Sequence, residues 1–200
     1  MRQDRLFSAT AMPDRDWWQL LWPDPELVVQ TLGVRCGMKV VDLGCGYGYF
    51  TAALAAQVGP GQVIAIDVDP GMIEQAKTAC PDMPNCLWVH GDAMELRRLV
   101  PEPADFVLLA NALHGAPDKT ALAGEIRSVL QPEGRLAVIN WHPIARERTI
   151  VLDRPRGPET RLRMSPAQTC MAVEPAGFTL EAVVELPPYH YGAIFICTGK

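Results

Sequence analysis

The sequence lacks the features that mark a membrane, secreted or nucleic-acid-binding protein. It contains no apolar run close to the roughly 18 to 20 residues needed to cross a bilayer. Residues 1–18 mix Arg, Asp and Pro and lack the apolar core of a secretory signal. With 18 Lys and Arg against 23 Asp and Glu, the formal net charge is −5, which offers no general basis for holding nucleic acid. We therefore expect a cytoplasmic protein with no membrane or nucleic-acid partner.

The cysteines also lack the spacing of a disulfide framework or a metal site. Six are present, but they form no C-x-x-C pair and lie mostly in apolar segments, as reduced core side chains do. We therefore predict no metal. Two hundred residues with 48% apolar composition suffice for a substantial core, and no internal repeat divides the chain. We expect one domain, 1–200, with an N-terminal lid or helix segment at 1–33.

Apolar segments typical of buried strands alternate with helical patterns along most of the chain. Five such segments lie at 39–43, 63–66, 86–90, 105–111 and 135–141. This alternation predicts a parallel sheet with helices on both faces. After a connection at 143–164, strands at 178–186 and 189–197 are separated by only two prolines, so they must form an antiparallel hairpin. The predicted fold is α/β: a Rossmann-like, doubly wound, seven-stranded sheet with five parallel strands, then a C-terminal hairpin with an antiparallel seventh strand.

The most informative segment is the glycine-rich turn after the first strand, which runs from Asp42 through Gly44, Gly46 and Tyr47 to Gly48. Glycine permits backbone angles closed to other residues and lets a ligand approach the main chain. The spacing G-x-G-x-G differs from the G-x-G-x-x-G of a dinucleotide site. The Asp42 carboxylate would repel a pyrophosphate and attract a cation. Both features disfavour a nicotinamide-dependent oxidoreductase.

This segment resembles the glycine-rich loop of the class I S-adenosylmethionine (SAM) methyltransferases, in which D-x-G-x-G-x-G receives the amino acid part of a cationic sulfonium. Residues 65–72 are similar to the second motif of this family, whose acid, here Asp67, accepts the ribose hydroxyls. Residues 90–93 match the position where an acid, here Asp92, lies near the adenine amino group. The closing hairpin also fits the family, and the small-molecule branch that includes the ubiquinone-biosynthesis and arsenite methyltransferases is the most similar.

The resemblance implies SAM as the cofactor and S-adenosylhomocysteine (SAH) as the product. Asn111 ends the fourth strand, where the methionine portion would lie, and Met72 can pack on the adenine face. The cofactor-binding residues that it implies are Asp42, Gly44, Gly46, Tyr47, Gly48, Asp67, Val68, Met72, Asp92, Ala93 and Asn111.

No catalytic triad is expected, because the sulfonium already carries the reactive methyl group and the protein need only align it with the acceptor. All four histidines are predicted at the ligand-binding edge of the sheet, where they can be simply polar loop residues at strand ends. If one of them acts as a general base, His114 and His142 are the candidates. Aromatic faces at the same edge can hold a planar or cationic acceptor. Trp17, Trp18 and Trp22 can equally pack the N-terminal helix against the body. The acceptor candidates are Trp18, Trp141, His190, Tyr191 and Arg163.

Arg163 belongs to a basic connection. Residues 143–164 carry six arginines and three acidic residues, a net charge of +3. Our hypothesis is that this connection holds an anionic acceptor, such as a carboxylate or a phosphate. The alternative is a solvated loop with local Arg–acid pairs.

Taken together, the sequence predicts a methyltransferase that moves a methyl group from SAM to a small-molecule acceptor by in-line displacement. The alternative is a SAM-binding sensor without catalysis. The acceptor, its reacting atom and the oligomeric state are left open.

Overall fold

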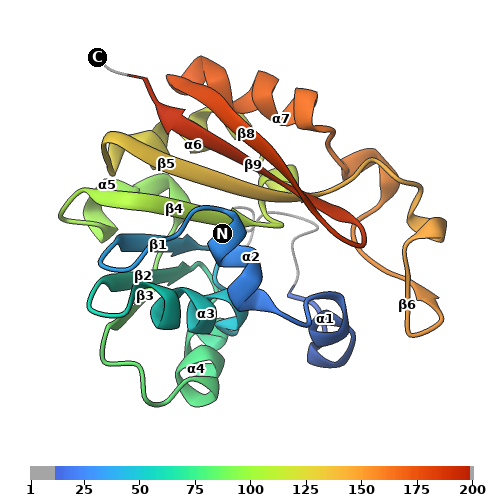
Figure 1. Ribbon diagram of the computed structural model, residues 1–200, viewed down its shortest axis with the longest axis horizontal. Coiled ribbons are helices and arrows are strands. Elements are labelled where there is room, and N and C mark those ends of the chain that lie inside the picture. The colour runs from blue at the N-terminus through green and yellow to red at the C-terminus, as the bar shows by residue number, and fades with distance from the viewer. Residues whose placement is uncertain (1–11, 199–200) are drawn as a thin grey trace, which may run out of the picture.

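The protein is described by a computed structural model over residues 12–198. Residues 1–11, which belong to the expected N-terminal segment at 1–33, lie outside this range, as do 199–200. A twisted sheet runs through the middle of the molecule (Figure 1). Its strands are β1 (Lys39–Leu43), β2 (Gln62–Asp67), β3 (Cys86–His90), β4 (Ala104–Ala110), β5 (Leu130–Trp141), β8 (Phe178–Leu186) and β9 (His190–Cys197).

The sheet has the order β3-β2-β1-β4-β5-β9-β8. Strands β1 to β5 are parallel to one another, whereas β9 is antiparallel to both β5 and β8. The predicted seven-stranded arrangement, with its closing hairpin and antiparallel last strand, is therefore confirmed. Strand β5 begins earlier than expected, at Leu130 rather than at residue 135.

Helices cover both faces of the sheet because successive strand residues point to opposite sides. Val40 and Val63 pack in the core formed with α2 and α3, whereas Val41 and Ile64 pack in the core formed with α5, α6 and α7. The helices are α1 (Arg15–Leu21), α2 (Pro25–Thr31), α3 (Tyr49–Val58), α4 (Pro70–Ala79), α5 (Leu96–Leu99), α6 (Lys119–Ser128) and α7 (Pro166–Val173). No helix formed by residues 12–198 is long and apolar enough to cross a membrane.

Helix starts follow local sequence signals. The Asp69 side chain accepts a hydrogen bond from the Gly71 amide at 2.7 Å, and Pro70 opens α4 directly after it. Ser165 and Gln168 form a reciprocal capping box at the start of α7. These starts fix how each helix leaves the preceding strand or loop.

Two features create a site at one end of the sheet. The chain winds away from β1 in both directions, toward β2 on one side and β4 on the other, so a crevice opens beyond their carboxyl ends. The connection after β5 leaves at the same end and contacts α1 (Figure 1). It contains short 3-10 helices η4 (Arg146–Arg148) and η5 (Thr160–Leu162) and a small antiparallel hairpin of β6 (Ile150–Val151) and β7 (Arg154–Pro155).

Candidate functional site

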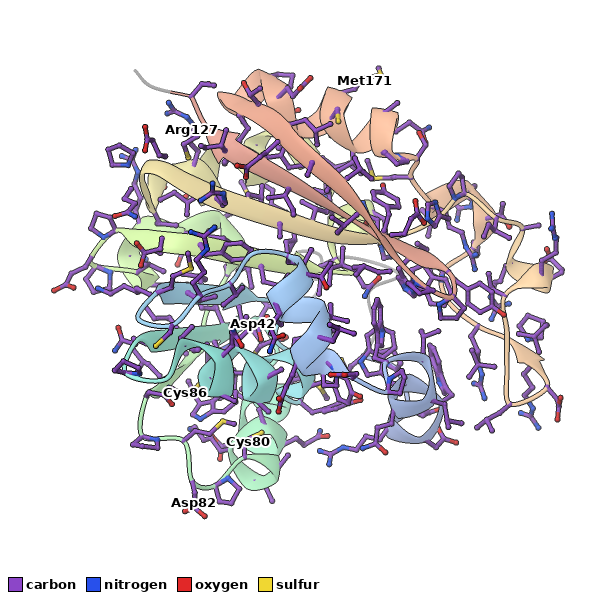
Figure 2. All side chains as sticks on the ribbon, in the orientation of Figure 1. Asp42, Cys80, Asp82, Cys86, Arg127 and Met171 are labelled. Atoms are coloured by element: carbon purple, nitrogen blue, oxygen red, sulfur yellow. The ribbon has the colours of Figure 1, made fainter. Side chains whose placement is uncertain are left out.

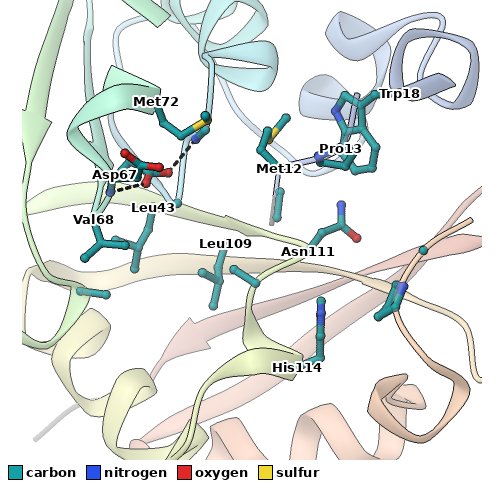
Figure 3. A pocket seen from close by; sticks show the side chains of 18 of the residues that line it. Met12, Pro13, Trp18, Leu43, Asp67, Val68, Met72, Leu109, Asn111 and His114 are labelled. Carbon is teal, nitrogen blue, oxygen red and sulfur yellow. Dashed lines mark hydrogen bonds between the residues drawn. The ribbon is translucent and has the colours of Figure 1, made fainter. Parts of the chain in front are cut away.

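A cavity of about 850 Å³ opens at the carboxyl ends of the parallel strands (Figure 3). Residues at the ends of β1 to β5 line it, together with residues 12–18 and the connection after β5. Its volume falls in the range of about 300 to 1,000 Å³ that is typical of small-molecule sites. The cavity lies where the doubly wound topology predicts a ligand.

Asp67 joins the glycine turn to the end of β2. One carboxylate oxygen accepts a hydrogen bond from the Gly46 amide at 2.8 Å, and the other accepts from the Asp69 amide at 2.9 Å (Figure 3). Burial raises the pKa of Asp67, while these backbone donors lower it. At Gly46, where φ is +54°, an added Cβ would overlap the sulfur of Met12. The turn therefore requires glycine where the N-terminal segment crosses it.

Asp92 and Ala93 line the cavity at the end of β3. The Asp92 carboxylate accepts from the Met94 amide at 2.9 Å and begins the 3-10 helix η2 (Ala93–Glu95). Val68 and Met72 line the cavity near Asp67 (Figure 3). Two carboxylates at neighbouring strand ends thus flank an apolar surface.

Asn111, at the end of β4, has an uncommon backbone conformation and a buried side-chain amide. Its φ is +57°, a left-handed conformation that few residues other than glycine adopt. Both polar atoms of its side chain are buried, and neither has a hydrogen-bond partner among residues 12–198. Buried amides are normally satisfied, and strained residues gather at functional sites. Asn111 therefore lies at the cavity wall with an amide donor and an amide acceptor that form no hydrogen bond within residues 12–198.

His114 is the histidine that lines the cavity. It lies in the 3-10 helix η3 (Leu113–Gly115), one turn beyond Asn111, and is 7% exposed. Figure 3 shows its ring across the cavity from Trp18. A buried imidazole in this position can exchange a proton with a bound molecule.

The other end of the cavity is aromatic and basic. Trp17 and Trp18 from α1 line it with Trp141 at the end of β5. Arg146 and Arg156 reach it from the connection. Of the residues proposed from the sequence, those that line the cavity are Gly44, Gly46, Asp67, Val68, Met72, Asp92, Ala93, Asn111, His114, Trp18 and Trp141.

Three residues expected at the cofactor lie outside the cavity lining. The Asp42 carboxyl is buried inside the molecule (Figure 2) and accepts from the Thr51 hydroxyl at 2.5 Å. Burial raises its pKa to about 7 despite that hydrogen bond. The ring of Tyr47 lies 4.5 Å from the Arg15 guanidinium, and Gly48 packs against β3 and α4. These residues support the glycine-rich turn from outside the cavity.

All four histidines lie at or just beyond the carboxyl ends of the parallel strands, but three of them do not line the cavity. His90 is exposed and lies 3.2 Å from the Val68 carbonyl oxygen. His142 does not line the cavity, and its Nε2 lies 2.9 Å from a Glu185 carboxylate oxygen on β8. His190 is 1% exposed, and burial holds its pKa well below the usual value.

The remaining acceptor candidates also pack inside the protein. His190 lies between the rings of Trp22 and Trp141, at centroid distances of 4.4 and 4.1 Å. The Tyr191 hydroxyl donates to the Met164 carbonyl at 2.9 Å and lies 2.7 Å from the Thr169 hydroxyl. Neither His190 nor Tyr191 lines the cavity. Strand β9 is covered by neighbours on both faces, so its side chains belong to the core.

Arg163 likewise has a different place from the one expected. It is 4% exposed and donates to the carbonyl oxygens of Pro158 (3.1 Å), Ile144 (2.9 Å) and Arg156 (2.9 Å). Its guanidinium also lies 4.8 Å from the Trp141 ring. Burial lowers its pKa. These bonds hold the connection together, and Arg163 does not line the cavity.

Sequence reasoning missed several lining residues. Met12, Pro13 and Asp14 enter from the N-terminal side, and Gly157 and Pro158 enter from the connection. None belongs to a motif, and their approach depends on how α1 meets the connection. The arginine content of 143–164 was a signal for Arg146 and Arg156, but it did not separate them from the other four.

The sheet order, the glycine turn and the acids at two strand ends define a Rossmann-like domain built to hold a nucleoside-containing ligand. A family model described as a methyltransferase domain matches residues 40–134. The chain is 34% identical over 139 residues to demethylmenaquinone methyltransferases of Staphylococcus aureus, which covers 69% of this chain and 55% of theirs. The chain thus spans about half the length of the curated relatives it matches.

Solved structures agree on the fold. A SAM-dependent methyltransferase from Aquifex aeolicus is 27% identical, with a TM-score of 0.78 over 92% of this chain and 94% of that one. The cyclase SpnF, 16% identical, matches with a TM-score of 0.70 over 88% of this chain and 81% of its own. The chain is thus similar to SAM-dependent methyltransferases in sequence over residues 40–134 and in fold over most of its length. SpnF shows that this fold is also used by a protein named for another reaction.

The family implies SAM as the cofactor and SAH as the product. The cavity fits such a molecule, because Asp67 and Asp92 supply acceptors for hydroxyl and amino donors, and the unpartnered Asn111 amide supplies both a donor and an acceptor. Among the described residues, no group of three or more His, Cys, Asp or Glu side chains is placed to hold a metal ion.

Proposed function

We propose that this chain binds SAM in the 850 Å³ cavity and transfers the methyl group to a small-molecule acceptor by in-line displacement, leaving SAH. The observation that carries the proposal is Asn111, a left-handed, buried amide without a partner in residues 12–198, placed between two acid-ended strands and an aromatic wall. The proposed cofactor-binding residues are Gly44, Gly46, Asp67, Val68, Met72, Asp92, Ala93 and Asn111.

The protein contributes alignment and proton transfer. SAM, when bound, supplies an electrophilic methyl group on a sulfonium. Asp67 and Asp92 hold the cofactor end, Trp18 and Trp141 exclude water from the acceptor end, and His114 accepts the proton of an acceptor hydroxyl. For a thiolate or a neutral amine, alignment alone suffices. A cytoplasmic location and the absence of a nucleic-acid partner remain predictions from the composition.

Equilibrium binding tests the cofactor assignment. SAM and SAH should bind with similar affinity, and NAD should not bind. Asp67→Asn should weaken SAH binding by about 10- to 100-fold, because a charged acceptor is lost from the site. Asp118→Asn is the matched control, because Asp118 caps α6 and does not line the cavity. Binding of NAD without SAM would refute the proposal.

Turnover separates an enzyme from a sensor. Purified protein with methyl-labelled SAM should transfer label to at least one member of a panel of phenols, thiols and amines. His114→Gln should lower kcat for phenols far more than for thiols, because thiols are already ionised in part at neutral pH. SAH binding without transfer to any member of the panel would favour the sensor.

A further inference from the structure

Two arginines of the connection deliver positive charge to the cavity. Arg146 and Arg156 line it, whereas Arg161 pairs at the surface with Glu159 at 2.7 Å and Arg163 is buried within the connection. The basic character of 143–164 is thus focused at the acceptor end by two side chains. Neither of them is Arg163, the arginine of this connection that the sequence analysis names as an acceptor candidate.

Backbone carbonyl groups hold the guanidinium groups of Arg146 and Arg156 in place, and within residues 12–198 no carboxylate pairs with them. The Nε of Arg146 donates to the Gly157 carbonyl at 3.0 Å. The Nε of Arg156 donates to the Val151 carbonyl at 3.4 Å, and its guanidinium lies 5.1 Å from the Trp17 ring. Within residues 12–198, neither forms an ion pair with a carboxylate, and no hydrogen bond uses their terminal nitrogens. The two terminal nitrogens of each guanidinium can therefore donate hydrogen bonds to a ligand.

The backbone behind both arginines is fixed. The hydroxyl of Thr149, which is fully buried, lies 2.8 Å from the carbonyl oxygens of both Arg146 and Arg156. Arg163 donates to that hydroxyl at 3.0 Å and to the Arg156 carbonyl at 2.9 Å. The Arg146 amide donates to the Thr160 hydroxyl at 3.0 Å. Two cationic forks on a braced backbone form a preorganised anion site.

The two acids at the cofactor end of the cavity are remote from this site, and within residues 12–198 Asp14, which also lines the cavity, forms no ion pair with either arginine. Asp67 and Asp92 end β2 and β3, whereas the arginines follow β5, which is three and four strands away. At about 4.8 Å per strand, the ends of β2 and β5 lie roughly 14 Å apart. This exceeds the Debye length of about 8 Å at physiological salt. The cavity thus has an acidic end for the cofactor and a basic end.

Flat aromatic rings also line the basic end of the cavity. Trp17 and Trp141 line it, and Gly157 presses its backbone against the Trp141 ring, since an added Cβ would lie 2.8 Å from that ring. We propose that the acceptor is a small organic anion with a planar apolar body, whose carboxylate or phosphate group is held by Arg146 and Arg156. This proposal rests on the proposed function and names the substrate class of the same site.

Calorimetric titration of SAH-saturated protein tests the proposal. The probes are benzoate, phenyl phosphate and benzamide, the last a neutral isostere of benzoate. Wild type should bind at least one anionic probe about tenfold more tightly than benzamide. The double variant Arg146→Gln/Arg156→Gln should bind all three probes equally. Arg154→Gln, which removes an exposed arginine of the same connection outside the cavity lining, should keep the wild-type preference.

The SAH titration separates this proposal from the proposed function. The double variant should bind SAH as wild type does. Failure of wild type to bind SAH would refute the proposed function. Normal SAH binding with no preference for the anionic probes, or with no binding of any probe, would overturn the anion proposal alone. A drop in SAH affinity in the double variant would also overturn it, because the arginines would then serve the cofactor.

Discussion

Asn111 combines two local costs that nothing among the described residues offsets. A left-handed φ of +57° is unfavourable for a residue with a Cβ, and its buried amide lacks partners within residues 12–198. An unsatisfied buried polar group costs about 1 to 3 kcal/mol, and glycine adopts this backbone conformation without strain. Cofactor binding is the event that would satisfy the amide. Stability and function should therefore conflict at this position.

The variant Asn111→Gly tests that conflict. Without ligand, its free energy of unfolding should equal or exceed that of wild type by about 1 kcal/mol. Its SAH affinity should fall about tenfold, because one or two hydrogen bonds are lost. Urea unfolding and calorimetric titration measure the two quantities. A variant that loses stability and keeps its affinity would assign Asn111 a structural role.

At the scale of single residues, the sequence predicted the strand-end side chains and missed most of those that loops deliver. Asp67, Asp92 and Asn111 follow apolar strands directly, so strand alternation alone brings them to one edge. Arg156 and Arg163 lie seven positions apart in one irregular connection. Which of them is buried depends on carbonyl groups brought together by long-range packing, and no local pattern encodes that.

At the scale of elements, the connection after β5 is held by polar contacts more than by apolar burial. Arg163 donates four hydrogen bonds inside it, including one to the Thr149 hydroxyl. The sequence predicted the connection as a boundary between strands. It did not predict the small hairpin of β6 and β7, because two-residue strands leave no periodic signal.

The variant Arg163→Lys should loosen this connection. Lysine keeps the charge but cannot reproduce the planar fork, so several buried carbonyl oxygens lose their donors. We expect a loss of about 2 to 4 kcal/mol in the free energy of unfolding and faster proteolysis within 143–164. Arg161→Lys, which alters an exposed ion pair with Glu159, should cost less than about 0.5 kcal/mol. Equal effects of the two variants would contradict the bracing role.

At the scale of the whole molecule, two buried groups give stability opposite pH dependences. Burial raises the pKa of Asp42 from 3.8 to about 7, so the folded state binds the extra proton and stability falls as the pH rises through this window. Burial, assisted by Arg163 and His142, holds the pKa of His190 well below 6.5. The unfolded state then binds the extra proton, so stability falls as the pH drops below 6.5. Between about pH 4.5 and 6.5 the two effects oppose each other.

Single variants should separate the two contributions. Each slope approaches about 1.4 kcal/mol per pH unit when one proton is involved. His190→Leu leaves the Asp42 contribution unopposed, so its stability should fall relative to wild type as the pH rises from 4.5 to 6.5. Asp42→Asn should show the reverse trend. The raised pKa of Asp67 acts in the same sense as that of Asp42, but it is common to all three proteins and cancels in the differences. Urea unfolding at pH 4.5, 5.5 and 6.5 measures the profiles, and three parallel curves would show that neither buried group governs the pH dependence.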